Sequence, residues 1–232
     1  MEHGFTWVSI IPIVSESEKL KVVFPTLLVV IFLFVVCKKI SSSIASSKEH
    51  IVPEEKMSAQ NLFELIVQVT LNMMKDIIGP SSDKFLPLIG SLFIYIFFCN
   101  LLGVIPGFLP PTISLYTNAA CALIVFFYYN YLGIKEHGFA YAKQFMGPLI
   151  WLAPLMAVIE LLSHCFRPFS LSVRLFGNMF GDHAILSIFS DLVPLGLPVI
   201  FISLALVVAL IQAFIFSALS AVYIGLAISH DH

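Results

Sequence analysis

Long stretches without any Asp, Glu, Lys or Arg constrain this chain more than any other feature. The longest are Phe85–Ile134 and Leu192–His230, and Val22–Cys37 and Gln144–Ile159 are shorter ones. Hydrophobic residues make up 59% of the sequence and charged residues only 11%, whereas about 25% of a typical soluble domain is charged. A soluble fold of this length could not bury so much apolar surface. The sequence therefore predicts an all-α polytopic membrane protein whose solvent is largely membrane lipid.

About five spanning helices are expected in a single integral membrane domain that covers residues 1–232. The expected spans are 22–40, 85–103, 116–134, 146–191 and 198–228. At ~1.5 Å per helical residue the last two are longer than a hydrocarbon core of ~30 Å. We therefore expect them to form a long, steeply inclined hairpin with its turn near residue 193. Pro148, Pro154 and Pro168 would bend the first of the two helices.

A further helix over residues 58–78 is predicted to be amphipathic. Glu64, Gln68 and Asn72 recur at every fourth position and share one face, while apolar residues occupy the other. This pattern is typical of a helix that lies in the membrane interface. A short helix packed on the rest of the protein is the alternative.

Lysines are distributed unevenly among the expected loops. They are Lys38, Lys39, Lys48, Lys56, Lys75 and Lys84 between the first two spans, and Lys135 and Lys143 after the third. The connection Gly103–Leu115 carries no charge. Cytoplasmic loops are richer in lysine and arginine, so the N-terminus is expected outside and the C-terminus in the cytoplasm. The lysines that directly follow Val22–Cys37 also favour a span there over a cleaved signal peptide.

The chain has only two arginines, Arg167 and Arg174, and both fall in the inclined fourth span. A guanidinium at membrane depth costs from ~2.5 to more than ~10 kcal/mol, and it cannot escape by losing its proton. We therefore interpret Arg174 as functional. Arg167, beside Pro168, better fits an arginine whose side chain reaches the membrane surface.

Other polar residues follow Arg174 and precede it in the same expected helix. Glu160 lies four helical turns before Arg174 on nearly the same face, and Asn178, Asp182 and His183 follow within about two turns. Carboxyl and imidazole groups can relay protons. The alternatives are internal hydrogen bonds for the two acids and a buried core position for His183. His164 fits a membrane-interface residue equally well.

Turn geometry predicts a partner for Arg174. If the hairpin turns near residue 193, Arg174 faces Gln212, the only amide side chain in the apolar run Leu197–Ile228. Gly177 and Gly181 form a GxxxG motif, which would let the two helices approach closely.

Several classes of site are not expected. The four cysteines lie far apart in or beside apolar runs, without metal-ligand spacing, so neither a metal nor a cofactor is expected. The net charge of −2 argues against a nucleic-acid partner. The sequence has no GxxxxGK[ST] loop, so nucleotide chemistry would belong to another protein and this chain would not be an enzyme by itself.

The segment from Pro168 to Met179, which reads PFSLSVRLFGNM, resembles the signature of the subunit a family of bacterial F-type ATP synthases. Gly181 and His183 continue the likeness. Gln212 and Tyr223 resemble the family's last helix, and an earlier motif of the family resembles Asn100, Pro106, Pro110 and Thr112. The resemblance covers essentially the whole chain in segment order.

This resemblance implies a proton-conducting stator subunit in the bacterial plasma (inner) membrane. Its partners would be the rotating ring of subunit c, the peripheral stalk of subunit b and the rest of the ATP synthase. Arg174 would face the ring carboxylate, and Gln212, which the hairpin geometry above places opposite it, would orient it. The resemblance places Glu160, Ser163 and Ser170 in a cytoplasmic half-channel. It places Asn178, His183 and Gln212 toward the outer half-channel or around Arg174.

The chain departs from the family at one place. Many members have an acid and an imidazole across the last two helices, but Leu197–Ile228 has neither and Ala205 stands at the expected position. Asp182, beside His183, is the candidate to compensate. A secondary transporter or antiporter using Glu160 and Asp182 as ion ligands is the alternative function, and a non-conducting membrane scaffold is another. Proton and sodium both remain open as the carried ion.

Overall fold

The computed structural model describes residues 18–46, 59–105, 107–138, 153–192 and 196–228. Their α-helices are α2 (Glu18–Ser46), α3 (Ala59–Ile78), α4 (Leu86–Val104), α5 (Leu115–His137), α7 (Ala153–Leu192) and α8 (Leu197–Ile228). Two 3-10 helices, η2 (Pro80–Lys84) and η3 (Pro111–Ile113), flank α4. The part of the chain that the structure describes contains no strand. The predicted all-α fold class is confirmed.

Four of these helices are long and apolar enough to cross a membrane. They are Leu20–Ser41 within α2, α4, α5 and Pro198–Ile228 within α8. Their lengths follow directly from the uncharged runs of the sequence. Helix α7 is not in this set because its ionisable residues lower its hydropathy. A fifth crossing by α7 remains a prediction.

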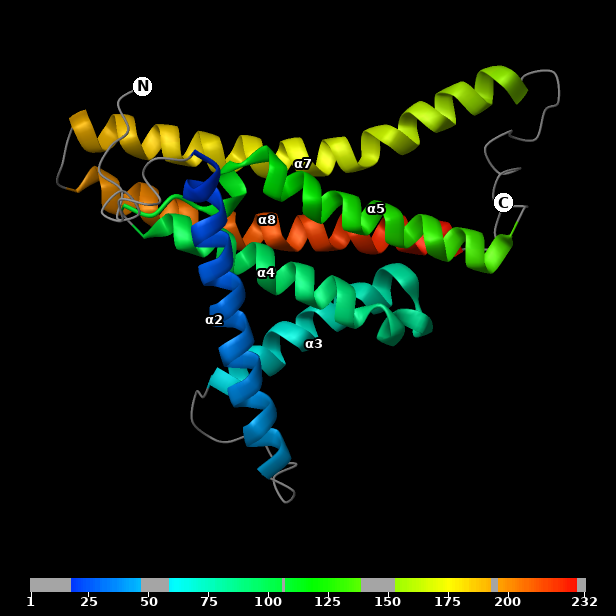
Figure 1. Cartoon of the computed structure of the whole chain (residues 1–232), viewed down its shortest axis with the longest axis horizontal. Coiled ribbons are helices and arrows are strands. Elements are labelled where there is room, and N and C mark those ends of the chain that lie inside the picture. The colour runs from blue at the N-terminus through cyan, green and yellow to red at the C-terminus, as the bar shows by residue number, and fades with distance from the viewer. Residues whose placement is uncertain (1–17, 47–58, 106, 139–152, 193–195, 229–232) are drawn as a thin grey trace.

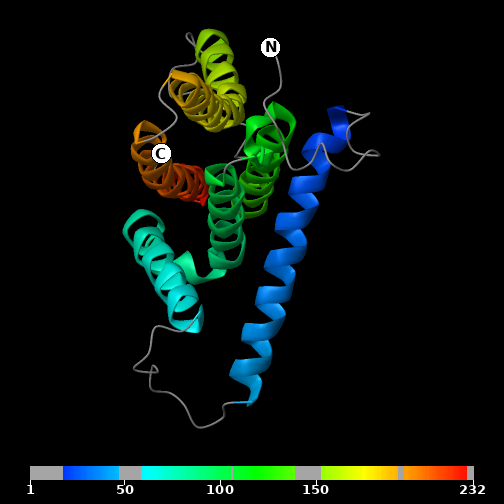
Figure 2. The ribbon, with the colours of Figure 1, turned by 90° about the vertical axis from the view of Figure 1, so that its left-hand side faces the viewer.

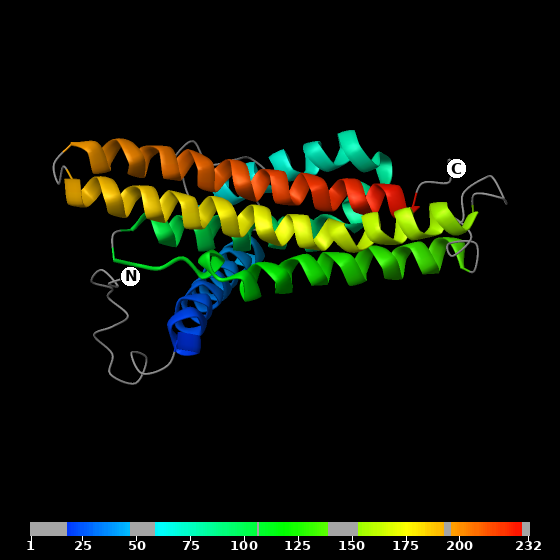
Figure 3. The same cartoon turned by 90° about the horizontal axis from the view of Figure 1, so that it is seen from above.

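Helices α7 and α8 form a long antiparallel pair. They contain 40 and 32 residues, or about 60 and 48 Å at ~1.5 Å per residue. Figure 3 shows them side by side along most of their length. Figure 1 shows a bend in α7, which contains Pro168. A proline inside a helix bends it because it lacks an N–H group and clashes with the preceding turn. The expected turn centre at residue 193 and residues 146–152 lie outside the described residues.

Helix α8 is at the centre of the bundle and packs against α3, α4, α5 and α7. The core contains Ile89 and Ile96 from α4, Val125 from α5, Leu175 from α7 and Ile224 from α8. Helix α8 also buries small residues completely, namely Ala209, Ala213 and Ala221. Small side chains let helix backbones approach closely in a membrane, where lipid provides no hydrophobic force between helices.

Helices α2 and α3 lie at the edge of the bundle. Figure 1 shows that α2 runs across the direction of α4. Figure 2 shows α2 and α3 on different sides of α4. The rings of Phe32 and Phe98 join α2 to α4 at 5.5 Å between centroids. Helix α3 packs on α4 and α8 and buries Thr70 and Met74, while Glu64 is exposed. Its position in the membrane interface remains a prediction.

Candidate ion-translocation site

Arg174 lies on the outward face of α7. Its neighbours Leu171 and Leu175 are 3% and 1% exposed and pack into the bundle, whereas Arg174 is exposed. Among the residues that the structure describes, Arg174 forms no hydrogen bond or ion pair. Its charge is therefore presented to whatever surrounds the bundle.

Gln212 is on the neighbouring helix but is buried. It is 7% exposed and lies between Ala209 and Ala213, which are completely buried. Helices α7 and α8 pack together, so the two residues belong to adjacent antiparallel helices. Within the described ranges no hydrogen bond joins Gln212 to Arg174. The pairing of the two side chains remains a prediction.

The predicted role of Gly177 and Gly181 in a close α7–α8 contact is wrong. A Cβ atom at either glycine would meet no atom within 4 Å, so neither glycine makes room for α8. The small residues of the contact are the alanines of α8 instead. A GxxxG motif promotes packing only on the face that meets a partner, and these glycines share the outward side of α7 with Arg174.

Most of the predicted site residues form one polar stripe along α7. The stripe runs through Glu160, Ser163, Arg167, Ser170, Arg174, Asn178 and Asp182. Their spacing of three or four residues keeps them on one side of a helix with 3.6 residues per turn. Ser163 and Ser170 are exposed, and Asn178 and Asp182 are partly buried. His183 departs from this stripe by about 100°.

Arg167 has partners, unlike Arg174. Its guanidinium lies 3.8 Å from a carboxylate oxygen of Glu160 and 5.3 Å from the centre of the Tyr223 ring on α8. A half-exposed ion pair contributes at most ~1 kcal/mol, and a cation over an aromatic ring contributes a similar amount. Arg167 therefore links Glu160 to α8, a contact that the sequence did not indicate.

His164 is buried where α7 meets α5. Its position relative to the membrane interface remains a prediction. His164 is 6% exposed, and its Nε2 lies 2.8 Å from Oδ1 of Asn130. The Asn130 amide nitrogen donates to the carbonyl oxygen of Phe126 at 2.8 Å. That bond orients the amide, so the His164 nitrogen donates to the remaining oxygen. His164 fixes the packing of two helices.

A small cavity lies between α4, α7 and α8. Its volume is about 20 Å³, and its lining comprises Asn100, Gly103, Val104, Met179, Asp182, His183, Leu186, Ile202 and Ala205. His183 reaches α4 closely, because its Nε2 would lie 3.0 Å from a Cβ atom at Gly103. The structure thus brings Asp182 and His183 to one cavity with Asn100.

Buried hydrogen bonds hold the α4 side of this cavity. The Thr112 hydroxyl donates to Oδ1 of Asn100 at 2.7 Å, and the Asn118 amide donates to the Thr112 carbonyl oxygen at 2.7 Å. All three residues are at most 1% exposed. Asn100 was not among the predicted site residues. Its signal was present, because it is the only amide in the apolar helix α4.

A family model described as ATP synthase A chain matches residues 22–225 of this sequence. The chain belongs to the ATP synthase A chain family. A protein named ATP synthase subunit a from Bdellovibrio bacteriovorus is 45% identical over 192 residues, which cover 82% of this chain and 84% of that relative. One from Geobacter sulfurreducens is 43% identical over 201 residues, 87% and 86% of the two chains. One from Trichlorobacter lovleyi is 40% identical over 219 residues, 94% and 91%.

This membership in the ATP synthase A chain family confirms the resemblance drawn from PFSLSVRLFGNM. It also confirms the predicted role as a proton-translocating stator subunit of the ATP synthase membrane sector. The chain is thus a membrane subunit of that complex. Roles for Arg174 and for the residues of the two half-channels remain predictions.

Proposed function

We propose that Arg174 is the fixed cation of this stator subunit and faces the carboxylate of a rotating subunit c ring. Glu160, Ser163 and Ser170 form part of a cytoplasmic half-channel in this proposal. Asn178, Asp182 and His183 belong to the outer half-channel. The other partners are the subunit b stalk and the remaining, nucleotide-binding subunits of the complex. Gln212 orients Arg174.

The observation that carries this proposal is the exposed position of Arg174, without a charged partner among the described residues. A guanidinium at membrane depth needs an opposite charge or water, because lipid supplies neither. The two carboxylates nearest to Arg174 along α7 do not serve this purpose, since Glu160 pairs with Arg167 and Asp182 lines the cavity. In this proposal the counter-charge comes from outside the described part of the chain. A carboxylate on a passing ring helix meets this requirement.

The surface around Arg174 suits a neighbouring membrane helix. Helices α7 and α8 both expose apolar side chains, among them Phe169 and Val173 on α7 and Val207 and Ile211 on α8. Gly177, one turn away, leaves open space in which another helix could pack closely. Apolar side chains exposed on the two helices that carry the unpaired Arg174 are suited to a membrane helix that slides past and pauses at that charge.

The arrangement also supports a mechanism. The fixed cation stabilises the ionised ring carboxylate as it passes, so the proton leaves on one side of the stator. The same cation repels protons and blocks a direct leak between the half-channels. Each charge driven across the membrane gains ~2.3 kcal/mol per 100 mV. That energy turns the ring, and nucleotide chemistry takes place on other subunits.

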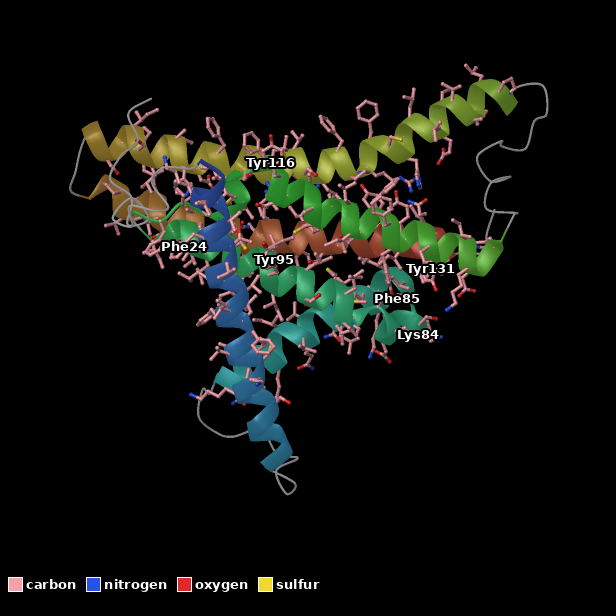
Figure 4. The ribbon with its side chains drawn as sticks, in the orientation of Figure 1. Phe24, Lys84, Phe85, Tyr95, Tyr116 and Tyr131 are labelled. Atoms are coloured by element: carbon pink, nitrogen blue, oxygen red, sulfur yellow. The ribbon has the colours of Figure 1, made fainter. Side chains whose placement is uncertain are left out.

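The two ends of the bundle carry different residues, which supports the orientation. Figure 4 shows Lys84 and Tyr131 toward one end and Tyr116, at the start of α5, nearer the middle. Lys84 and Lys135 share the first end, and the segment from η3 to the start of α5 has no charge. The lysine-bearing end is the cytoplasmic side of the bacterial plasma membrane in this proposal, with the N-terminus outside.

The test is ATP-driven proton pumping by membrane vesicles that contain the complete complex with Arg174→Ala. We expect no pumping, with normal amounts of the subunit in the membrane, because the exposed side chain holds no helix in place. Arg167→Ala is the matched control and should retain most of the pumping, since Arg167 makes contacts of only ~1 kcal/mol each. Near-normal pumping by Arg174→Ala would overturn the proposal.

A further inference from the structure

Helix α7 bends in the region that contains Pro168. Proline has no N–H group, so the carbonyl oxygen of His164, four residues earlier, does not receive the usual helix hydrogen bond. The Ser172 hydroxyl donates to the Pro168 carbonyl oxygen at 2.8 Å, and bonds of this kind often bend a helix as well. Figure 1 shows the change of direction in α7. The backbone permits a bend here, but the packing around it has to set the angle.

A single buried side chain fastens the first part of α7 to the bundle. From Pro154 to Ser170 every side chain is exposed or partly buried except that of His164, which is 6% exposed. Buried side chains recur regularly only after the bend, beginning with Leu171. The segment Pro154–Ser163, which contains Glu160, therefore depends chiefly on His164 for its position against the bundle.

Helix α5 holds the imidazole of His164 through polar and aromatic contacts. Nε2 lies 2.8 Å from Oδ1 of Asn130 and 3.4 Å from the Tyr129 hydroxyl. The rings of Phe126 and Tyr129 each lie 5.2 Å from the imidazole between centroids. Lipid provides no hydrophobic force between helices, so a hydrogen bond across two helices is what fixes one against the other. The bond between His164 and Asn130 lies one helical turn before Pro168, where it can set the angle of the bend.

Arg167 makes a second, weaker contact near the bend. Its side chain is 24% exposed, and its guanidinium lies 5.3 Å from the centre of the Tyr223 ring on α8. A contact that water or lipid can reach holds a helix less firmly than a buried one, because both partners can exchange it for solvent. His164 is therefore the main anchor of this part of α7.

We propose that His164 is a positioning residue whose hydrogen bond to Asn130 fixes the bend of α7 and so holds Glu160 and Ser163 at a set distance from Arg174. This inference rests on the proposed function, which gives those three residues their roles. Glu160 and Ser163 precede the bend and Arg174 follows it, so a change of angle alters the separation between them. His164 acts through the position of α7 and takes no part in the proton transfers.

The first test measures the bend in the complete complex. Spin labels are attached to Leu155→Cys in α7 and Ile134→Cys in α5, in a background without other cysteines; both positions are exposed. Leu155 precedes Pro168 by roughly 20 Å of helix, so a small change of angle moves it far. We expect one narrow distance distribution with His164 and a broader or shifted one with His164→Leu. His164→Gln, whose amide nitrogen can still donate to Asn130, should keep the narrow distribution.

The second test measures ATP-driven proton pumping per assembled complex. His164→Leu keeps a buried side chain but removes the donor. We expect pumping to fall about tenfold, because a misplacement of ~1 Å can slow a reaction as much as ~100-fold. His164→Gln should restore most of the pumping. Cys165→Ser is the matched control, since Cys165 is exposed beside His164, and it should pump normally.

Asn130→Leu removes the same hydrogen bond from the α5 side and leaves His164 in place. It should reproduce both effects of His164→Leu. The double variant should be no worse than either single one, because residues that share one interaction are not additive. If His164→Leu does not accumulate in membranes, Asn130→Leu decides by the same two measurements.

Several results would overturn the inference. One is an unchanged distance distribution in the variants that lack the hydrogen bond, and another is normal pumping despite a broadened distribution. Failure of both His164→Leu and Asn130→Leu to accumulate in membranes would show a role in folding only, which also overturns it. So would a loss of pumping that His164→Gln does not restore.

Arg174→Ala, assayed in parallel, separates this inference from the proposed function. If Arg174→Ala still pumps, the role proposed for Arg174 fails, while the distance distributions still decide whether His164 fixes the bend. If Arg174→Ala abolishes pumping and His164→Leu matches the wild type in both measurements, only the inference is overturned.

Discussion

Nε2 of His183 lies 3.0 Å from the position that a Cβ atom would occupy at Gly103. The same Cβ atom would lie 2.7 Å from Pro110, closer than real contacts allow. Gly103 thus provides the space in which the end of α4, the segment after it and the imidazole of α7 meet. This close approach places His183 at the cavity, and it is possible because Gly103 has no side chain.

Gly103→Ala should therefore disturb the cavity. The ring of Pro110 or the imidazole has to move, and forcing one extra carbon into a packed site costs about 1–3 kcal/mol. We expect less of the subunit in membranes and slower proton pumping by the complex that does assemble. Immunoblots of membranes and ATP-driven pumping per assembled complex measure the two effects.

Gly90→Ala is the matched control on the same helix. A Cβ atom there would lie 3.7 Å from a Leu86 methyl group, which is ordinary contact. Alanine also favours a helix over glycine by about 1 kcal/mol. Gly90→Ala should leave both readouts unchanged. Equal losses from the two variants would contradict the role given to Gly103.

The sequence was sufficient to predict where the helices lie along the chain. It was not sufficient to predict which side of each helix packs against a neighbouring helix. Helices α4, α5 and α8 follow from uncharged runs, because lipid requires helices long enough to cross it. Gly177 and Gly181 show the limit of a motif. The sequence marks two small residues on one face, but only the packed structure decides whether α8 or the surroundings meet that face.

Contacts between residues that are far apart in the sequence could not be predicted either. No sequence pattern joined His164 to Asn130 or Arg167 to Tyr223, because those pairs depend on how α5, α7 and α8 pack together. Asn100 was detectable as an amide in an apolar helix. That Asn100 and Asp182 line one cavity was not detectable, since this depends on how α4 and α7 pack.

Arg174→Lys should abolish coupled proton pumping almost as fully as alanine does. A lysine can lose its proton when it is removed from water, whereas a guanidinium keeps its charge and its planar set of donors. We expect a fall of at least about 100-fold, the usual effect of losing a preorganised charge. Arg167→Lys, which keeps a cation beside Glu160, should pump normally. Strong pumping by Arg174→Lys would show that any cation is sufficient at this position.

The orientation can be measured by labelling single cysteines in a background without the four native ones. Lys84 and Tyr116 are both exposed (Figure 4), and the candidate span α4 lies between them along the chain. Lys84→Cys should react with an impermeant reagent only from the cytoplasmic side, and Tyr116→Cys only from outside. Thr112 lies near Tyr116 but is a poor position, because it is 1% exposed. Labelling with the sides exchanged would invert the topology and the assignment of the half-channels.

Gln212 should increase the rate of proton pumping by orienting the guanidinium of Arg174, without being essential for pumping. Its buried amide, between Ala209 and Ala213 on α8, is uncharged, so it can orient a guanidinium without neutralising it. Gln212→Leu should slow pumping about tenfold, as expected for losing one hydrogen bond to a charged group of about 1.5 kcal/mol. Gln212→Glu should be worse, because an ion pair with Arg174 would compete with the ring carboxylate. Gln68→Leu on α3 is the control, since Gln68 is exposed, and it should pump normally. If Gln212→Glu pumps better than Gln212→Leu, the amide does not orient the arginine.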